Sequence, residues 1–185
     1  ITSLSTEIDT RYKKQIIFAG RLSKEKGIRT VIETAKKLPK DIDLIIVGDG
    51  PEKPFVIESV KNCQNIHYLG YQPKEKTIPL IRGSKLLIQP SIAEGISATL
   101  LEAMACNTPV IATNVGGNVE LFSNDSGILI EPENSEELLN QIVSIIDDEE
   151  KLEKISKLAF SEVQNYTWSN IGQKYLDLYK KLLNS

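Results

Sequence analysis

The chain of 185 residues is predicted to form an α/β domain built on a Rossmann-like, doubly wound parallel sheet of about six strands. Its short apolar runs each end at a turn signal, and most are followed by a segment with helical period. That alternation is typical of parallel strands joined by crossover helices on both faces of a sheet. The length is sufficient to bury roughly 70% of the unfolded surface in a single core. Ligands of such sheets bind at the carboxyl ends of the strands, and the motifs described below lie there.

The predicted strands are the apolar runs QIIFAG (15–20), DLIIVG (43–48), NIHYLG (65–70), KLLIQP (85–90), PVIAT (109–113) and SGILI (126–130). Helices are predicted over 28–38, 52–61, 73–82, 98–106 and 135–147, with a short turn near Val119. Residues 1–12 show no usable period and are predicted to be the remnant of an interdomain linker, so the domain itself spans 13–185.

A long charged tail, 149–183, is predicted to be helical with a break near Asn165 and Thr167. Its last part carries a stripe of large apolar side chains at helical spacing: Trp168, Ile171, Tyr175, Leu178, Tyr179 and Leu182. Such a stripe belongs to a core more often than to a docking surface, so we expect it to be buried.

Charge and cysteine content limit the classes of function. The formal net charge is −3 and the pI is about 5.4, so a nucleic acid is not expected as a partner. Cys63 and Cys106 lie far apart and match no zinc spacing, which predicts reduced thiols in a cytosolic protein. No signal segment opens the chain, and no apolar run approaches the ~20 residues that span a bilayer. A soluble, cytoplasmic protein is therefore predicted.

The loop after the first strand, GRLSKEKG (20–27), gathers Arg21, Lys24 and Lys26 between a strand end and a helix start. Free backbone N–H groups and the helix dipole favour an anion at such a place, so a diphosphate would fit. A solvated basic turn is the alternative. The loop is not a P-loop, and VGDGPEK after the second strand lacks the third glycine of the dinucleotide fingerprint, which disfavours nicotinamide or flavin binding.

Two further loops have two interpretations each. LGYQPKEK after the third strand could present backbone groups to a base edge or could be a simple turn. NVGGNVE (114–120) places two glycines where the backbone approaches something closely or turns with positive φ. His67, the only histidine, lies in a strand pattern and is expected to have a buried structural role.

The stretch SIAEGISATLLEAMACNTPVIAT (91–113) places Glu94 and Glu102 around a predicted helix start near Ala98. The amides of Ser97, Ala98 and Thr99 are then unpaired donors between two carboxylates. A ligand with hydroxyls at both ends and phosphates in the middle would suit this arrangement. The alternative is a capping box, Thr99-x-x-Glu102, in which Glu102 only turns back to the cap N–H.

Taken together and in this order, the motifs resemble the C-terminal domain of the family-4 retaining glycosyltransferases, enzymes with the two-Rossmann-domain GT-B fold. The resemblance covers nearly all of the chain from Ile16 onward, and its specific part is the Glu-x7-Glu element with EAMA and PVIAT. It is carried by FAGRLSKEKG, LIIVGDGPE, IHYLGYQP, LLIQPSIAEGISATLLEAMACNTPVIATNVGGNVE, SGILIEPEN and YTWSNIGQKYLDLY.

The resemblance implies a nucleotide-sugar donor site that needs no metal and no cofactor. Residues matching Arg21 and Lys26 contact the donor diphosphate and take the place of a metal in stabilising the leaving group. The residue matching Glu94 contacts the sugar, the one matching Glu102 takes the ribose hydroxyls, and Tyr71 lies where the base is held. The implied donor site is Gly20, Arg21, Lys26, Tyr71, Glu94, Gly95, Ile96, Ser97, Ala98, Thr99, Leu100 and Glu102, with Arg21, Lys26 and Glu94 as the catalytic groups.

Three positions depart from the family pattern. Gly95-Ile96-Ser97 replaces the usual Gly-Phe-Gly, and the loss of one glycine bears on which sugar is bound. Asn107 stands for the usual glycine before Thr-Pro and tolerates the left-handed conformation, and Lys85 stands where an aspartate often opens the fourth strand. The last two differences are interpreted as structural.

The family's acceptor site lies in an N-terminal domain, so this chain is expected to be the donor half of a larger enzyme and inactive alone. The complete enzyme would transfer a hexosyl group from a nucleoside-diphosphate sugar to a glycan or lipid-linked acceptor. It would act in the cytoplasm, or peripherally at the inner face of the membrane. The alternatives are a non-catalytic nucleotide-binding or regulatory module and a nucleotide-sugar epimerase of the same fold.

Overall fold

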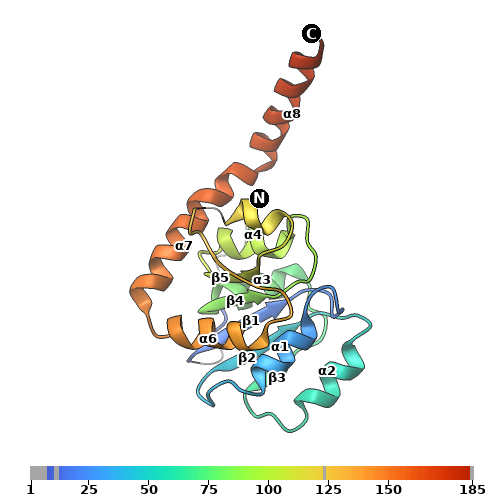
Figure 1. The fold of residues 1–185 in the computed structure, drawn as a ribbon, viewed down its shortest axis with the longest axis vertical. Helices are drawn as coiled ribbons and strands as arrows, with labels where there is room; N and C mark the ends of the chain where they lie inside the picture. Colours follow the sequence, from blue (N-terminus) through green and yellow to red (C-terminus); the bar gives the residue numbers. More distant parts are fainter. Residues whose placement is uncertain (1–7, 11–12, 123, 184–185) are drawn as a thin grey trace.

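The centre of the molecule is a six-stranded parallel sheet, seen here in a computed structural model that describes residues 8–10, 13–122 and 124–183. The strand order is β3-β2-β1-β4-β5-β6 (Figure 1), which confirms the predicted doubly wound α/β fold. The strands are β1 (Gln15–Ala19), β2 (Asp43–Val47), β3 (Ile66–Tyr68), β4 (Leu86–Gln89), β5 (Val110–Thr113) and β6 (Ile128–Ile130).

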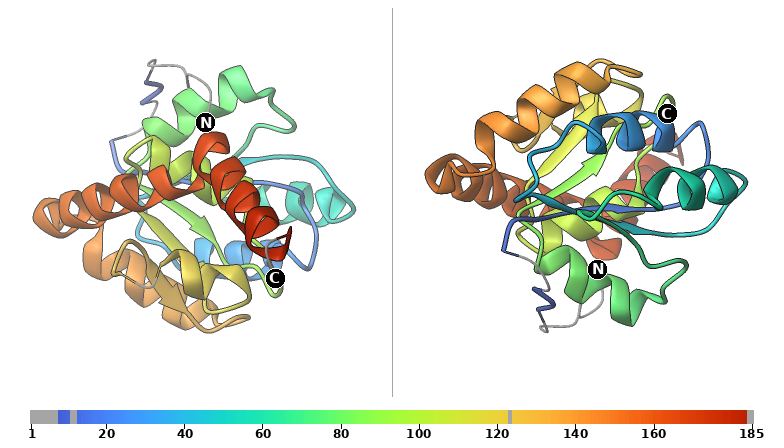
Figure 2. Two further views of the ribbon diagram at one scale, coloured as in Figure 1. Left: turned by 90° about the horizontal axis from the view of Figure 1, so that it is seen from above. Right: turned by 90° about the horizontal axis from the view of Figure 1, so that it is seen from below.

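Helices cover both faces of this sheet, as the views in Figure 2 show. One apolar cluster joins the sheet to α1 (Ile28–Ala35), α2 (Lys53–Val60) and α6 (Ser135–Ile145). The other joins it to α3 (Lys74–Arg82), α4 (Ala98–Ala105), α5 (Gly117–Leu121) and the end of α7 (Glu149–Val163).

The strands are mostly apolar, with polar residues chiefly at their ends, because both faces of the sheet are buried. In β1, Ile16 and Phe18 point into the first cluster, whereas Ile17 and Ala19 point into the second. Burying one such large side chain stabilises the fold by about 1.5–3 kcal/mol.

The strand order places the site. From β1 the chain first adds β2 and β3 on one side, and then crosses to β4 on the other side of β1. The carboxyl ends of β1 and β4 are therefore neighbours at the point where the winding reverses. The loops that follow these two strands, 20–27 and 90–97, therefore start side by side at this edge of the sheet.

The C-terminal helix departs from the prediction. After η1 (Gln164–Tyr166), helix α8 (Trp168–Leu183) projects away from the sheet layers (Figure 1), and it contains no buried residue. Trp168 is 83% exposed, so the expectation that the apolar stripe belongs to the core was wrong. Helical period shows that a face needs a partner, but it does not identify the partner.

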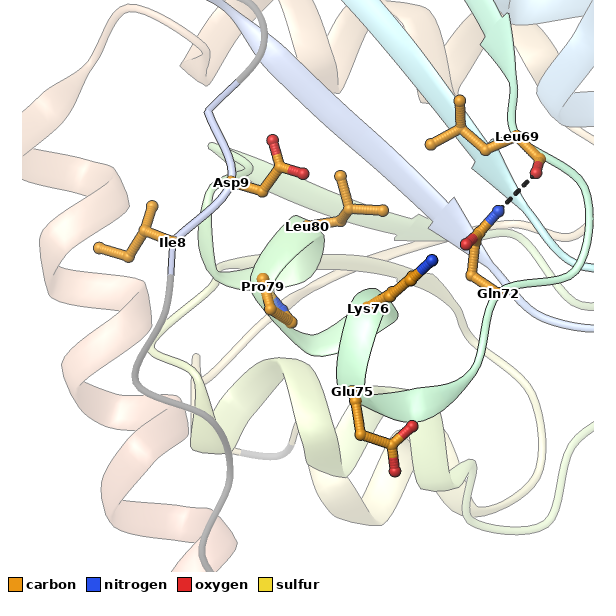
Figure 3. Close-up of a pocket in the computed structure, with 8 residues that line it drawn as sticks. All are labelled: Ile8, Asp9, Leu69, Gln72, Glu75, Lys76, Pro79 and Leu80. Atoms are coloured by element: carbon orange, nitrogen blue, oxygen red, sulfur yellow. Dashed lines mark hydrogen bonds between the residues drawn. The ribbon is translucent and has the colours of Figure 1, made fainter.

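Part of the predicted linker packs on α3. The amide of Asp9 donates to the carbonyl of Pro79 at 3.0 Å, and Gln15 Nε2 donates to the carbonyl of Asp9. Ile8 and Asp9 thereby form one wall of a pocket of about 630 Å³ over α3 and the end of β3 (Figure 3). Residues 1–7 and 11–12 of the predicted linker lie outside the described residues.

Several smaller expectations are confirmed. Asn107 adopts φ 57°, as expected where it replaces a glycine, and Lys85 forms an ion pair with Glu149 on the surface. Cys63 and Cys106 are both free thiols, and burial raises the pKa of Cys106. The expectation of a buried His67 is not confirmed, because this residue is only partly buried; its Nε2 lies 2.8 Å from the carboxylate of Asp43.

None of the helices in the described part of the chain is both long and apolar enough to cross a bilayer.

Candidate functional site

The loops after β1 and β4 touch each other at a glycine. Gly27 precedes α1 with φ +69°, and a Cβ built on it would lie 1.8 Å from the carbonyl oxygen of Pro90. The amide of Ile92 also donates to the carbonyl of Glu25 at 2.8 Å. Any side chain at position 27 would push the basic loop off the loop that carries Glu94. The contact places Lys26 beside Glu94.

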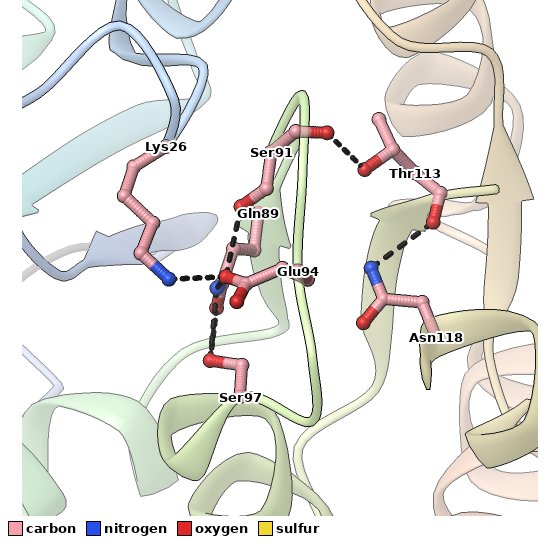
Figure 4. A network of polar contacts seen from close by, with 7 residues as sticks. All are labelled: Lys26, Gln89, Ser91, Glu94, Ser97, Thr113 and Asn118. Carbon is pink, nitrogen blue, oxygen red and sulfur yellow. Dashed lines mark hydrogen bonds and ion pairs between the residues drawn. The ribbon is translucent and has the colours of Figure 1, made fainter. Parts of the chain in front are cut away.

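The Glu94 carboxylate is the centre of a polar network (Figure 4). Its side chain is only 8% exposed, and it forms an ion pair with the ammonium of Lys26. Gln89 Nε2 donates to Glu94 Oε1 at 2.7 Å, and the hydroxyl of Ser91 donates to the same oxygen at 3.1 Å. Three donors therefore converge on Oε1 and fix the carboxylate, which leaves Oε2 for a further hydrogen bond.

The two glycines of NVGGNVE pack directly against the backbone of the Glu94 loop. Gly116 has φ +50°, and a Cβ there would lie 1.8 Å from the carbonyl oxygen of Glu94. A Cβ on Gly117 would lie 2.3 Å from the carbonyl oxygen of Gly95. Of the two interpretations of this motif, close backbone approach therefore applies at both glycines, and positive φ applies at the first.

A second set of hydrogen bonds ties β5 to the same loop. Thr113 Oγ1 donates to the carbonyl of Ser91 at 2.5 Å, and Asn118 Nδ2 donates to the carbonyl of Thr113 at 3.0 Å (Figure 4). Thr113 and Asn118 are both fully buried. The backbone that carries Glu94 is thus held from β5 as well as from β4.

Helix α4 begins at Ala98, as predicted, and its N-cap is Ser97. Thr99 therefore lies inside the first turn, and Glu102 pairs with Lys74 Nζ at 2.7 Å. The capping-box alternative, which needs Thr99 as the cap, is wrong. The Glu102 side chain is 23% exposed and faces Lys74 at the start of α3.

A pocket of about 330 Å³ extends from the carboxyl ends of β1 and β2 to α4. It is lined by Ala19, Gly20, Arg21, Val47, Gly48, Asp49, Tyr71, Gln72, Thr77, Thr99 and Glu102. The first turn of α4 joins this pocket to the Glu94 network, because Ser97 belongs to the network and Thr99 lines the pocket. The start of α4 is thus shared by the network and the pocket.

Most of the residues predicted for the site are brought together. Gly20, Arg21, Tyr71, Thr99 and Glu102 line the pocket. Lys26, Glu94 and Ser97 form the network, and Gly95, Ile96, Ala98 and Leu100 lie in the same loop and first turn of α4. Lys24 of the basic loop is exposed and is in neither group.

Sequence reasoning missed several residues of this site. Gln89 and Ser91 bind Glu94, Lys74 pairs with Glu102, and Asp49 and Gln72 line the pocket. Each lies within a few residues of a strand's carboxyl end, and that position is the signal that could have identified them.

The charge of Asp49 at the pocket wall is already compensated. Hydrogen bonds from Lys53 Nζ and from the amide of Gly50, each 2.7 Å long, hold the pKa of this carboxyl below its usual value. Lys53 is thus the charge partner of Asp49, and Arg21 also lines this pocket. Among the described residues, no group of three or more His, Cys, Asp or Glu side chains is placed to hold a metal ion.

Residues 7–161 match the family described as glycosyl transferases group 1. The chain belongs to this family. The chain has a Rossmann-like α/β fold. This fold is similar to that of solved GT-B glycosyltransferases.

Relatives of this chain include N-acetyl-alpha-D-glucosaminyl L-malate synthase of Bacillus anthracis, which is 30% identical over 178 residues. That alignment covers 92% of this chain and 46% of the synthase, and the chain spans about half the length of the curated relatives it matches. HepE of Anabaena, solved in complex with UDP-glucose, has a TM-score of 0.79 and 27% identity over 90% of this chain and 48% of HepE.

A third match is to a single domain. The C-terminal domain of a glycosyl transferase group 1 family protein (LpcC) from Francisella tularensis has a TM-score of 0.73 and 29% identity. The match covers 83% of this chain and 86% of that domain. The chain is thus similar to an isolated domain that was crystallised by itself.

The Gly116 contact gives a first prediction. Gly116→Ala should lower the free energy of unfolding by about 1–3 kcal/mol, because alanine is strained at this positive φ. The overlap of the added Cβ with the Glu94 carbonyl should increase this loss. Urea denaturation would measure this loss. Gly172→Ala is the matched control, since Gly172 in α8 has no atom within 4 Å of its built Cβ and alanine favours a helix. Equal stability of the two variants would contradict the proposed constraint.

Proposed function

We propose that this chain is the donor-binding half of a retaining hexosyltransferase, which transfers a hexosyl group from a nucleoside-diphosphate sugar to a glycan or lipid-linked acceptor. The observation that carries the proposal is the position of Glu94. It is held between the basic loop and the start of α4, where the winding of the sheet reverses. The chain that carries it belongs to the family of glycosyl transferases group 1. UDP is the nucleotide to test first, because HepE was solved with UDP and with UDP-glucose.

The proposed chemistry requires stabilisation of the leaving group. When the glycosidic bond to phosphate breaks, its electron pair moves onto the departing diphosphate, whose negative charge therefore grows. Arg21, Lys26 and the amides of the first turn of α4 would stabilise this charge, and electrostatic stabilisation of this kind usually contributes more to catalysis than any other effect. With these positive groups in place, the site would need no divalent metal.

The two carboxylates would bind the two ends of the donor. Glu94 would accept a hydrogen bond from a sugar hydroxyl through Oε2, since the described donors to its carboxylate all bind Oε1. Glu102 would accept from the ribose hydroxyls at the pocket, and Tyr71, which is 71% exposed, would border the base.

The acceptor site would lie in another part of a larger protein. This proposal is supported by the coverage of about half of each curated relative and by the exposed apolar residues of α8. We propose that α8 packs on an N-terminal acceptor domain. Because the acceptor site would lie in that domain, the chain alone would transfer no sugar. A lipid-linked acceptor at the inner face of the membrane is one option, because a Campylobacter jejuni relative at 26% identity is named for an undecaprenol-linked substrate.

The direct test is a calorimetric titration of the 185-residue chain with UDP in the presence of chelator. We expect weak but measurable binding without metal, because Arg21, Lys26 and backbone amides supply the positive field. Binding that appears only after magnesium is added would contradict the metal-free part. In the complete enzyme, sugar transfer that requires an acceptor would distinguish a transferase from a sensor, and interconversion of donors without acceptor would indicate an epimerase.

Substitution of each glutamate should weaken the binding of a different part of the donor. Glu102→Gln should weaken UDP and UDP-sugar alike, because both carry the ribose. Glu94→Gln should spare UDP and weaken only the sugar-bearing donor. Loss of a charged hydrogen bond, worth about 1.5–3 kcal/mol, predicts affinity changes of about tenfold or more in calorimetry. Normal UDP binding by Glu102→Gln would exclude the ribose role, and normal donor binding by Glu94→Gln would exclude the sugar role.

The basic loop contains its own control. Arg21→Ala and Lys26→Ala in the complete enzyme should each lower kcat by about 10²-fold or more, with a smaller effect on the donor KM, because leaving-group charge grows in the transition state. Lys24→Ala should leave kcat nearly unchanged, since this exposed side chain belongs to neither part of the site. Steady-state kinetics that show equal losses for all three variants would contradict the proposed loop geometry.

A further inference from the structure

Gln89 is a buried polar residue at the end of an otherwise apolar strand. It is the last residue of β4, LLIQ, and only 3% of its surface is exposed. Burying an amide costs free energy unless the amide is hydrogen-bonded. The partners of Gln89 therefore indicate why an amide stands at this position.

The two amide protons of Gln89 go to two different parts of the site. Nε2 donates to Glu94 Oε1 at 2.7 Å and to the hydroxyl oxygen of Ser97 at 2.9 Å (Figure 4). The hydroxyl of Ser97 also lies 3.3 Å from Gln89 Oε1, which can accept its proton. One side chain thus joins the Glu94 carboxylate to the N-cap of α4.

Because its hydroxyl is bound to Gln89, Ser97 does not cap α4 with its side chain. Serine is a preferred N-cap, because its oxygen usually accepts a hydrogen bond from the second or third amide of the helix. Three other helices show this arrangement: Asn134 caps α6 by accepting from Glu137 N, Asp148 caps α7 by accepting from Lys151 N, and Thr167 caps α8 by accepting from Asn170 N. Ser97 makes no side-chain cap bond, and its hydroxyl is bound to Gln89 instead.

We propose that Gln89 is a positioning residue for donor binding. It holds the Glu94 carboxylate in place, and it keeps the Ser97 hydroxyl away from the first turn of α4, so that the amides there remain available to the diphosphate. This inference rests on the proposed function of the site.

Gln89→Met tests the inference, because methionine has nearly the same length and volume but cannot donate a hydrogen bond. Gln15→Met is the matched control. Gln15 is 1% exposed at the first position of β1, the opposite end of the strands from the site, and its Nε2 donates to the carbonyl of Leu80 and to Ser84 Oγ. The probes are UDP and UDP-glucose, titrated into the 185-residue chain, with the melting temperature measured for each variant.

We expect both variants to lower the melting temperature, because each leaves buried groups without a donor. Only Gln89→Met should weaken UDP, by about tenfold, because the released Ser97 hydroxyl then competes with phosphate for the α4 amides. UDP-glucose should be weakened further, because Glu94 has lost one of its donors.

The double variant Gln89→Met/Ser97→Ala separates positioning from simple damage to the fold. Without the hydroxyl, nothing competes for the α4 amides, so UDP affinity should return to near the wild-type value. UDP-glucose affinity should stay reduced, because Glu94 is still not held. A structural role alone would give the double variant no such recovery.

The outcomes also distinguish the inference from the function on which it depends. If the wild-type chain binds neither UDP nor UDP-glucose, both proposals fail. If the wild-type chain binds UDP and Gln89→Met binds it as tightly as Gln15→Met does, the inference alone is overturned. If Gln89→Met does not fold, Gln89→Leu, which matches the leucines of β4, takes its place in the same comparison.

Discussion

The absence of a Cβ at two glycines is the constraint on which the site depends. Gly27 lets the loop after β1 contact the loop after β4, and Gly116 lets the loop after β5 contact the backbone of Glu94. Each contact leaves no room for a side chain, and each glycine has positive φ, so the requirement is both steric and conformational. Three loops that are far apart in the sequence thereby converge on one carboxylate, and the parallel sheet supplies the fixed spacing between them.

Electrostatics at the site follow from this convergence. Each of the two glutamates already has a lysine partner, Lys26 for Glu94 and Lys74 for Glu102. The Glu94 pair is mostly shielded from solvent, whereas Lys74 is 59% exposed and its pair is screened by water. The two halves of the site therefore differ in exposure, with a largely buried network at Glu94 and a more solvent-facing pair at Glu102.

Much of the fold could be predicted from the sequence, because parallel strands buried on both faces are short apolar runs and each ends at a turn. The position of Glu94 and Glu102 around the start of α4 could be predicted for the same reason. The partners of Glu94 could not, because the rotamer of Gln89 and the bend at 92–93 depend on how the end of β4 packs. The exposure of α8 could not be predicted either, since periodicity does not identify what a face packs against.

The Lys26–Glu94 ion pair has a consequence for ligand selectivity. A small inorganic anion such as sulfate must draw Lys26 away from Glu94, and it brings no hydroxyl group to the carboxylate that is left. The buried carboxylate then keeps only its hydrogen bonds from Gln89 and Ser91, so we expect such an ion, like a diphosphate without a sugar, to bind more weakly than a ligand that also brings a hydroxyl group to Glu94. A molecule that carries an anion and a hydroxyl group at the right separation satisfies both partners at once. We therefore expect the ion pair to favour ligands that carry both groups over simple anions.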